Sequence, residues 1–418
     1  MIRLVRLNFV LALLVVLPTA VSAQQDSRYT REANKYIGLA MTRSDAAQRG
    51  EMYQQALTHL REGMERDADN AKVWLLAGQV FAALGEMTEA DRAFVKAVDM
   101  HPAYAEEIAS DRESAWIDAF NVGVNLMEEQ KFEEAIKVME DAQVIYNQRP
   151  EALMNLGVLY ANLGQSERAQ QAFEQAMEAA QGPLFEQLDE EQKGSWVRMR
   201  ELAQLNIAQM AAGEGVAAFE ARDFPKAEAS FRKATEINPH SRDYWFNYTQ
   251  SLWAQASSLE DALEGPAADE AKQKLPALYK RIEEMAQRTR TMDPYNEALY
   301  IIEARSVRMR SELQGESEAG QQAALKLLEA HDVLPVGLDD IQIYADGAGI
   351  AIAGKLKNRK LVPGAPVRIQ FTLLGADGKT VGEEIVTVEV PEADAETTFQ
   401  GRTTASSELA GWKYTIQT

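Results

Sequence analysis

The sequence contains no cysteine and only four histidines among its 418 residues. The absence of cysteine excludes disulfides, thiolate metal sites, cysteine nucleophiles and a lipid-modified N-terminal cysteine. His59, His101, His240 and His331 are not spaced in the pairs that bind a metal ion, and no HExxH motif occurs. We therefore expect neither a metal site nor a cofactor.

Motifs that carry catalytic chemistry are also missing. No serine lies in a G-x-S-x-G elbow, and no G-x-x-x-x-G-K-[ST] phosphate-binding loop occurs. Gly347-Ala348-Gly349 lacks the strand-to-helix context of a dinucleotide site and is more typical of a hairpin turn. Paired acids such as Glu128-Glu129 are usual on the solvated faces of acidic helices. We predict no catalytic residue; an enzyme with an unrecognised site is the alternative.

Basic residues are few. The chain has 43 Lys and Arg against 64 Asp and Glu, a net charge of −21 and a pI near 4.8. A nucleic-acid binder needs clustered Lys and Arg to neutralise phosphates, so nucleic acid is not an expected partner.

Only one apolar run stands out, and it is short. Phe9 to Leu17 follows Arg3 and Arg6, and Val21-Ser22-Ala23 places small residues before Gln24. This arrangement predicts a cleaved signal peptide over residues 1–23, because so short a run does not span a bilayer. A retained membrane anchor is the alternative. Cleavage would remove the two arginines and change the net charge from −21 to −23. We expect the mature protein to be exported to a periplasm; an extracellular or surface-associated location is the alternative.

What the sequence has instead is an internal repeat. The best copy places large, small and turn residues at fixed intervals over residues 73–102: Trp74, Ala77-Gly78, Phe81, Gly85, Ala90, Phe94, Ala97 and Pro102. This order predicts two helices that approach closely at the small residues, with a glycine-centred turn between them and a proline stop.

The same offsets recur along the chain. Further copies contain Val122-Gly123, Ala135 and Met139 with Gln130 at the turn; Leu156-Gly157, Tyr160, Gly164 and Phe173; Ala227, Phe231, Ala234 and Pro239 after Arg222-Asp223-Phe224; Trp245, Tyr248 and Leu252; and Tyr300, Ala304, Ala323, Leu327 and Ala330. Before Trp74, only Ala56 and Leu60 remain of a first copy. The pattern resembles the tetratricopeptide repeat, and we assign residues 24–335 to a mostly α solenoid of antiparallel helix pairs.

Three segments depart from the repeat. Extra residues lie at 102–119, 181–208 and 255–278. Gly182-Pro183 and Gly194 predict breaks, and Glu260 to Lys274 predicts an exposed loop or a helix extension.

After Pro335 the period changes from helical to alternating. Val367, Ile369, Phe371 and Leu373 alternate with polar residues before the turn Gly375-Ala376-Asp377-Gly378. Six or seven such strands predict a small β-sandwich over residues 336–418. Phe371-Thr372-Leu373-Leu374-Gly375 and Gly354-Lys355-Leu356-Lys357-Asn358 resemble the FxLYD family, which implies an immunoglobulin-like domain of an exported protein.

The tetratricopeptide resemblance also implies where a ligand would bind. In that family the first helix of each pair lines a concave groove. The side chains that face the groove lie one, five and eight residues after the first aromatic of the helix or its equivalent, and we call them groove positions. From these positions and their neighbours we select the following candidates: Phe120, Met127, Met154, Asn162, Phe246, Gln250, Trp253, Arg305 and Arg308.

Two alternatives stay open for these residues. The apolar candidates would equally serve to pack against an added helix or against the insertions. Arg305 and Arg308 would either hold a carboxylate of a ligand or pair with Glu303, Glu312 or neighbouring acids.

The sequence therefore predicts an exported, non-catalytic scaffold that binds a peptide or protein segment in its groove, in envelope assembly or maintenance. The partner and the oligomeric state are not specified. The alternative is a surface or glycan-binding adhesion module, in which Trp412 and Tyr414 would be exposed on the β domain. Their alternation with polar residues favours burial instead.

Overall fold

The computed structural model describes residues 26–346, 349–404 and 409–417. The predicted signal peptide and two residues of the predicted turn at 347–349 lie outside these ranges. The chain divides into two compact units, residues 1–147 and 148–418, and each is described by itself.

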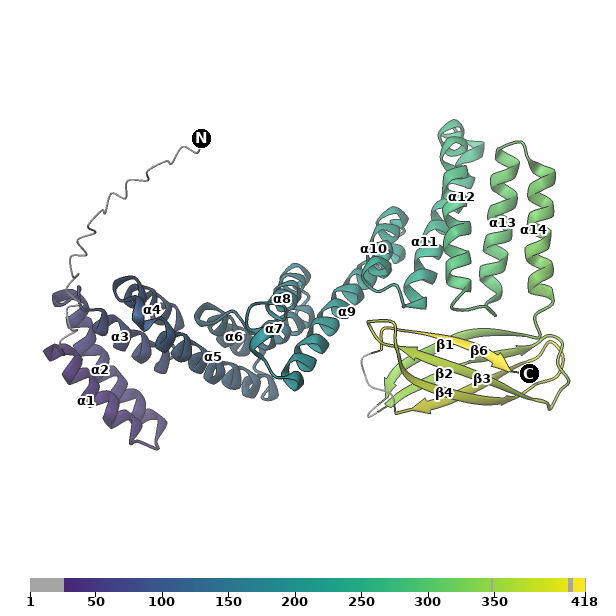
Figure 1. The fold of residues 1–418 in the computed structure, drawn as a ribbon. Coiled ribbons are helices and arrows are strands. Elements are labelled where there is room, and N and C mark those ends of the chain that lie inside the picture. The colour runs from purple at the N-terminus through teal and green to yellow at the C-terminus, as the bar shows by residue number, and fades with distance from the viewer. Residues whose placement is uncertain (1–25, 347–348, 405–408, 418) are drawn as a thin grey trace, which may run out of the picture. The chain divides into compact units, whose positions relative to one another are not determined.

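Helices come first and strands last (Figure 1). The helices of the first unit are α1 (Arg28–Met41), α2 (Ala46–Arg66), α3 (Ala71–Ala83), α4 (Met87–Met100), α5 (Ala105–Glu128) and α6 (Phe132–Ile145). Those of the second unit are α7 (Glu151–Asn162), α8 (Ser166–Ala179), α9 (Glu190–Glu220), α10 (Phe224–Ile237), α11 (Arg242–Asp261), α12 (Ala268–Arg290), α13 (Glu297–Leu313) and α14 (Ser317–Asp332).

Consecutive helices pack as pairs, from α1 with α2 to α13 with α14. The small residue of the repeat explains the close approach. A Cβ added to Gly78 would lie 2.4 Å from the Phe94 ring, and one added to Gly157 would lie 2.5 Å from the Phe173 ring. The predicted fold class, a tetratricopeptide-like solenoid followed by a β region, is confirmed.

The turn inside each pair repeats as well. Gly85 lies seven residues after Gly78 and has φ 77°, and Gln130 lies seven residues after Gly123 and has φ 61°. The left-handed conformation at this position reverses the chain between the two helices. The spacing brings a large residue of the second helix over the small residue, Phe94 over Gly78 and Met139 over Gly123.

The insertions lengthen first helices more than they form loops. Helix α5 has 24 residues and α9 has 31. Gly194 does not break the chain, contrary to the prediction, because it lies inside α9. A capping box of Asp189 and Gln192 starts that helix upstream of Gly194.

The insertion after Gln255 combines both predicted possibilities. Helix α11 continues to Asp261, a short 3₁₀ turn spans Ala262–Glu264, and α12 begins at Ala268 after Gly265-Pro266.

The last helix pair is in a different register from the one predicted. Ala323 and Ala330 are exposed, whereas Gly320, Ala324 and His331 are buried on the inner face of α14. Gly320 faces Ser311 of α13, where a Cβ would lie 2.3 Å from the serine Cβ.

Six strands follow within the described residues: β1 (Val336–Asp346), β2 (Gly349–Asn358), β3 (Pro366–Leu374), β4 (Thr380–Glu389), β5 (Glu396–Thr403) and β6 (Gly411–Gln417). They form two antiparallel sheets, β1-β2-β5 and β4-β3-β6. Alternate residues of both sheets, among them Ile352, Phe371 and Trp412, form one apolar core.

The β region is fastened to the helices by a buried polar cluster. The Tyr414 hydroxyl donates to Asp293 Oδ1 at 2.6 Å, and Arg242 Nε donates to Asp293 Oδ2 at 2.8 Å. Asn238 Nδ2 donates to the Ala410 carbonyl at 2.7 Å. Figure 1 shows the strands lying against the ends of α11 to α14. The strands are therefore joined to the helices by specific contacts as well as by the chain.

Candidate functional site

Helix α11 carries three of the predicted site residues. Its N-cap is Ser241, whose hydroxyl accepts from the Tyr244 backbone N–H. Tyr248, Leu252 and Ala256, four residues apart, are buried against the neighbouring helices. Phe246, Gln250 and Trp253 follow a second stripe of the same helix, and all three side chains are half-buried.

The two aromatic rings of this stripe are covered by arginines. The Arg242 guanidinium carbon lies 4.4 Å from the centroid of the Phe246 ring, and that of Arg305 lies 4.8 Å from the centroid of the Trp253 ring. Both contacts have cation–π geometry. Phe246 and Trp253 thus already have cationic partners within the chain.

Arg305 is held by a carboxylate from another helix. Its Nη2 lies 2.6 Å from Glu260 Oε2, and the Tyr279 hydroxyl donates to the other oxygen of Glu260. Burial and this hydrogen bond raise the pKa of the Tyr279 hydroxyl, so it stays protonated and continues to donate. Glu303 pairs with Arg290 at 2.7 Å instead. Arg308 is exposed, with its Nη2 3.9 Å from the sulfur of Met309.

Gln250 lies on an open cavity of about 360 Å³. Three elements line it: Val216, Phe219 and Glu220 of α9, Phe231 of α10, and Asn247 and Gln250 of α11. Phe231 is 1% exposed and Val216 is 45% exposed, so the cavity has an aromatic floor and an open mouth. Two amide side chains stand beside an apolar hollow, which suits a peptide backbone with an apolar side chain.

The sequence reasoning missed Val216 and Phe219, although the repeat contains the signal. Arg222 has φ 61°, and Gly215 lies seven residues before it, as Gly78 lies before Gly85. In that register the groove positions of α9 are Ala212, Val216 and Phe219. Alanine fills both large positions of this copy, Ala211 and Ala218, where the best copy has Trp74 and Phe81. This copy was therefore recognised only from its second helix onward.

The remaining candidates are divided between the two units. Phe120 and Met127 belong to the first unit, where Phe120 stacks on Trp116 with ring centroids 5.1 Å apart. Met154 and Asn162 lie on α7 of the second unit, half-buried and exposed respectively. Of the predicted site residues, Gln250 lines the cavity between α9 and α11.

The β region does not present the aromatic surface that the adhesion hypothesis requires. Trp412 and Tyr414 are each 4% exposed and belong to its core. That route to adhesion is wrong, because the alternation of strand β6 directs both rings inward.

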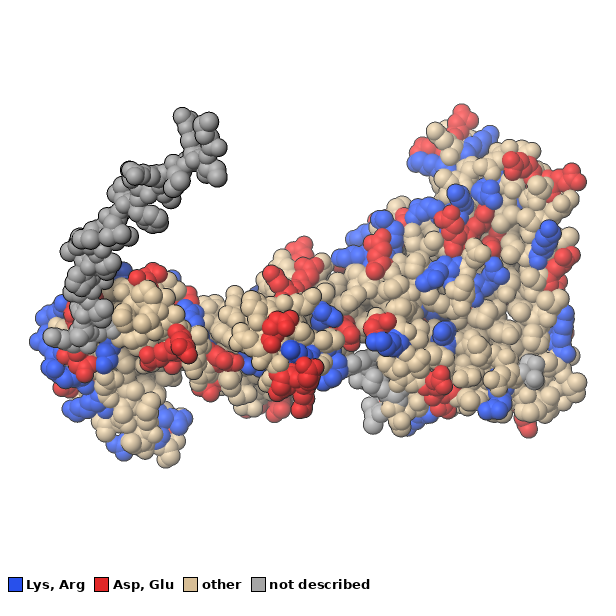
Figure 2. All heavy atoms as spheres, viewed as in Figure 1, with Lys and Arg blue, Asp and Glu red and all other residues tan. Residues whose placement is uncertain are grey.

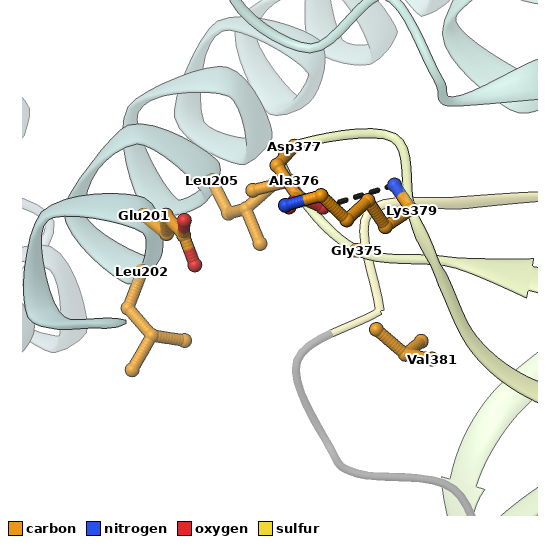
Figure 3. A pocket seen from close by; sticks show the side chains of 8 residues that line it. All are labelled: Glu201, Leu202, Leu205, Gly375, Ala376, Asp377, Lys379 and Val381. Atoms are coloured by element: carbon orange, nitrogen blue, oxygen red, sulfur yellow. Dashed lines mark hydrogen bonds and ion pairs between the residues drawn. The ribbon is translucent and has the colours of Figure 1, made fainter. Parts of the chain in front are cut away.

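A second cavity lies between α9 and the turn that joins β3 to β4 (Figure 3). Leu202, Leu205 and Val381 border it, and the carboxylate of Glu201 points toward the turn. Lys379 Nζ lies 2.6 Å from Asp377 Oδ2, so the two charges of the turn are paired with one another. It is less suited to a ligand than the cavity beside Gln250.

Within the described ranges, no three His, Asp or Glu side chains come together as a metal site would need. No helix of the described chain is long and apolar enough to cross a membrane. On the face shown in Figure 2, Lys and Arg are interspersed with Asp and Glu over the helices.

Comparison with known proteins supports the repeats. Two family models described as tetratricopeptide repeat match, one over residues 126–190 and the other over 41–105 and 213–276. The chain therefore contains tetratricopeptide repeats in both units. No curated protein sequence matches it significantly.

Solved structures of repeat proteins are similar at low identity. A crystal structure of MamA is 16% identical, covers 51% of this chain and 95% of its own, and has a TM-score of 0.20. YrrB, titled a TPR protein with an unusual peptide-binding site, is 16% identical over 57% of this chain and 94% of its own, with a TM-score of 0.23.

A third structure is the C-terminal part of a TPR repeat-containing protein from Cytophaga hutchinsonii. It is 15% identical over 72% of this chain and 95% of its own, with a TM-score of 0.23. At these values the names of the three proteins assign no ligand to this chain.

Proposed function

We propose that this protein is a non-catalytic interaction scaffold that binds an extended protein segment against α9 and α11. The observation that carries the proposal is the cavity lined by Val216, Phe219 and Gln250, which lie at groove positions of two successive first helices. An apolar side chain of the ligand fills the hollow, and the amides of Asn247 and Gln250 bond to its backbone.

The location is also part of the proposal. Export is supported by the features of a signal peptide, which are Arg3, Arg6, the apolar run Phe9 to Leu17 and the small residues Val21-Ser22-Ala23. A role in the cell envelope is supported by the FxLYD-like segments of the β region. Fusing residues 1–30 to a reporter enzyme that is active only after export tests this part. Activity that persists after Leu13→Arg in the apolar run would contradict it.

Binding is tested by selecting random peptides displayed on phage against the purified chain. We expect the selected peptides to share an apolar residue within an extended segment. Val216→Trp, which fills the cavity, should weaken their binding about tenfold or more, equivalent to about 1.4 kcal/mol. Gln209→Ala on the exposed side of α9 is the matched control and should leave binding unchanged. Equal binding by the Val216→Trp variant would exclude this site.

A further inference from the structure

The first unit contains a cavity that has no part in the proposed groove site. It is about 260 Å³ in volume and lies where the pair α3–α4 meets the pair α5–α6. Its walls are mainly methyl and thioether groups from Ala82, Met87, Val122 and Val138, and its two acidic residues are Asp118 and Asp141. Met87 is 6% exposed and Val122 is 49% exposed, so the cavity has a buried wall and an open mouth.

Contacts made elsewhere join three of the helices that line the cavity. Arg112 of α5 reaches Asp91 of α4 at 2.6 Å and donates to the Ile145 carbonyl of α6 at 2.9 Å. Its guanidinium carbon also lies 5.5 Å from the centroid of the Phe94 ring. Arg112 therefore joins three helices, and its positive charge is paired with Asp91.

The two carboxylates of the cavity differ in burial, since Asp118 is exposed and Asp141 is half-buried. Within the described residues, neither Asp118 nor Asp141 makes a hydrogen bond or an ion pair through its side chain. Apolar burial raises the pKa of Asp141, against a lowering by Lys137 and a further raising by Glu140. Lys137 offsets the effect of burial on Asp141 only in part, so a positively charged guest would further stabilise this carboxylate.

The walls select the kind of cation. A hard divalent ion takes six or more oxygen ligands, whereas this cavity offers two carboxylates among hydrocarbon groups. An ammonium group on an aliphatic stem matches both features, since its charge meets the carboxylates and its methylenes contact Met87, Val122 and Val138.

We propose that this cavity is a second docking site, which takes a lysine side chain of a partner protein segment whose neighbouring residues are apolar. The inference is independent of the groove site beside Gln250, because the two sites share no residue and lie in different units.

The probe is a synthetic peptide, acetyl-Ala-Leu-Lys-Leu-Ala-amide, titrated into the full chain with labelled methionine and valine methyl groups. We expect chemical-shift changes at Met87 and Val122, and binding about tenfold weaker when norleucine replaces lysine. Replacing lysine by arginine tests the preference for the narrower ammonium group. Equal binding of the lysine and norleucine peptides would overturn the proposal.

Variants of the chain give the second arm of the test. Asp118→Asn with Asp141→Asn should remove the preference for lysine while leaving the shape of the cavity intact. Glu133→Gln with Glu134→Gln, exposed acids at the start of α6, removes the same charge and should preserve it. If the Asn variant does not fold, Val122→Trp fills the cavity from its open side and should abolish the shift at Met87.

Two other results would count against the proposal. Shifts that survive in the Asn variant would show a general attraction of basic peptides to an acidic chain. Spermidine binding at Met87 as tight as that of the peptide would assign the cavity to a free polyamine instead of a protein segment.

Discussion

One residue in each of five helix pairs adopts the left-handed conformation at the turn. These residues are Gly85, Gln130, Gly164, Arg222 and Gly315, with φ between 61° and 80°. A side chain at such a position costs about 1–2 kcal/mol relative to the right-handed region, and glycine avoids that cost. The left-handed backbone conformation thus recurs at the same place in each pair. The residue at that place varies, and a residue other than glycine lowers the stability of the fold.

Two substitutions at this turn should have opposite effects on stability. Arg222→Gly should raise the free energy of unfolding by about 0.5–1 kcal/mol, since relief of the backbone strain exceeds the added entropy of the unfolded chain. Gly164→Ala should lower it by about 1–2 kcal/mol. Urea denaturation followed by circular dichroism measures both. Changes of the same sign would contradict the shared geometry.

Asp141 provides a prediction that depends on pH. Its pKa is raised, mainly by burial, so the folded state binds the proton more tightly than the unfolded state. The ionised Asp141 carboxylate therefore lowers the free energy of unfolding. This loss of stability is fully present above the pKa of the folded state and disappears as the pH falls through that pKa. Asp141→Asn should therefore stabilise the protein at pH 7 and have little effect near pH 3. Thermal melting at both pH values tests this, and a larger effect at pH 3 would contradict it.

At the scale of the helix, the small residue of each pair can be tested within a single element. Gly213 and Gly215 both lie in α9, but only Gly215 faces Phe231, where a Cβ would lie 2.9 Å from the ring. Gly215→Ala should destabilise by about 1–3 kcal/mol through overpacking. Gly213→Ala, with nothing within 4 Å, should stabilise by about 0.5–1 kcal/mol. Phe231→Leu should partly rescue Gly215→Ala in a double-mutant cycle, and the absence of rescue would show that the contact is unimportant.

The sequence predicts most helices well because each pair repeats its packing residues. It predicts the insertions less well. Gly194 indicates a break, yet the residues around it continue as helix because the cap at Asp189 satisfies the helix start and the long first helix remains packed along its length. The groove residues of α9 were missed because alanine fills both large positions of its repeat, Ala211 and Ala218, where the best copy has Trp74 and Phe81.

The sequence predicts a stripe of site residues on α11 but not the contacts that these side chains make. Gln250 lies on the cavity, whereas the rings of Phe246 and Trp253 are covered by Arg242 and Arg305. Arg305 comes from the next helix pair, and no sequence offset predicts that its charge would reach the Trp253 ring and Glu260 together.

At the scale of the whole molecule, the β region is predicted to unfold together with the helices that hold it. Tyr414→Phe removes the hydrogen bond to a buried Asp293, which is 1% exposed. We expect a loss of about 1–3 kcal/mol and easier proteolysis between α14 and β1. Thr415→Ala on the exposed side of β6 is the matched control. Unchanged proteolysis in the Tyr414→Phe variant would mean that the polar cluster does not hold the domain.

Hydrogen–deuterium exchange of the chain with and without a selected peptide tests the central claim most directly. Binding at the cavity predicts slower exchange over residues 213–220 of α9 and 242–253 of α11, with the β strands unchanged. Protection confined to residues 336–417, or protection of α9 and α11 that persists in the Val216→Trp variant, would contradict the assignment of the ligand to this groove.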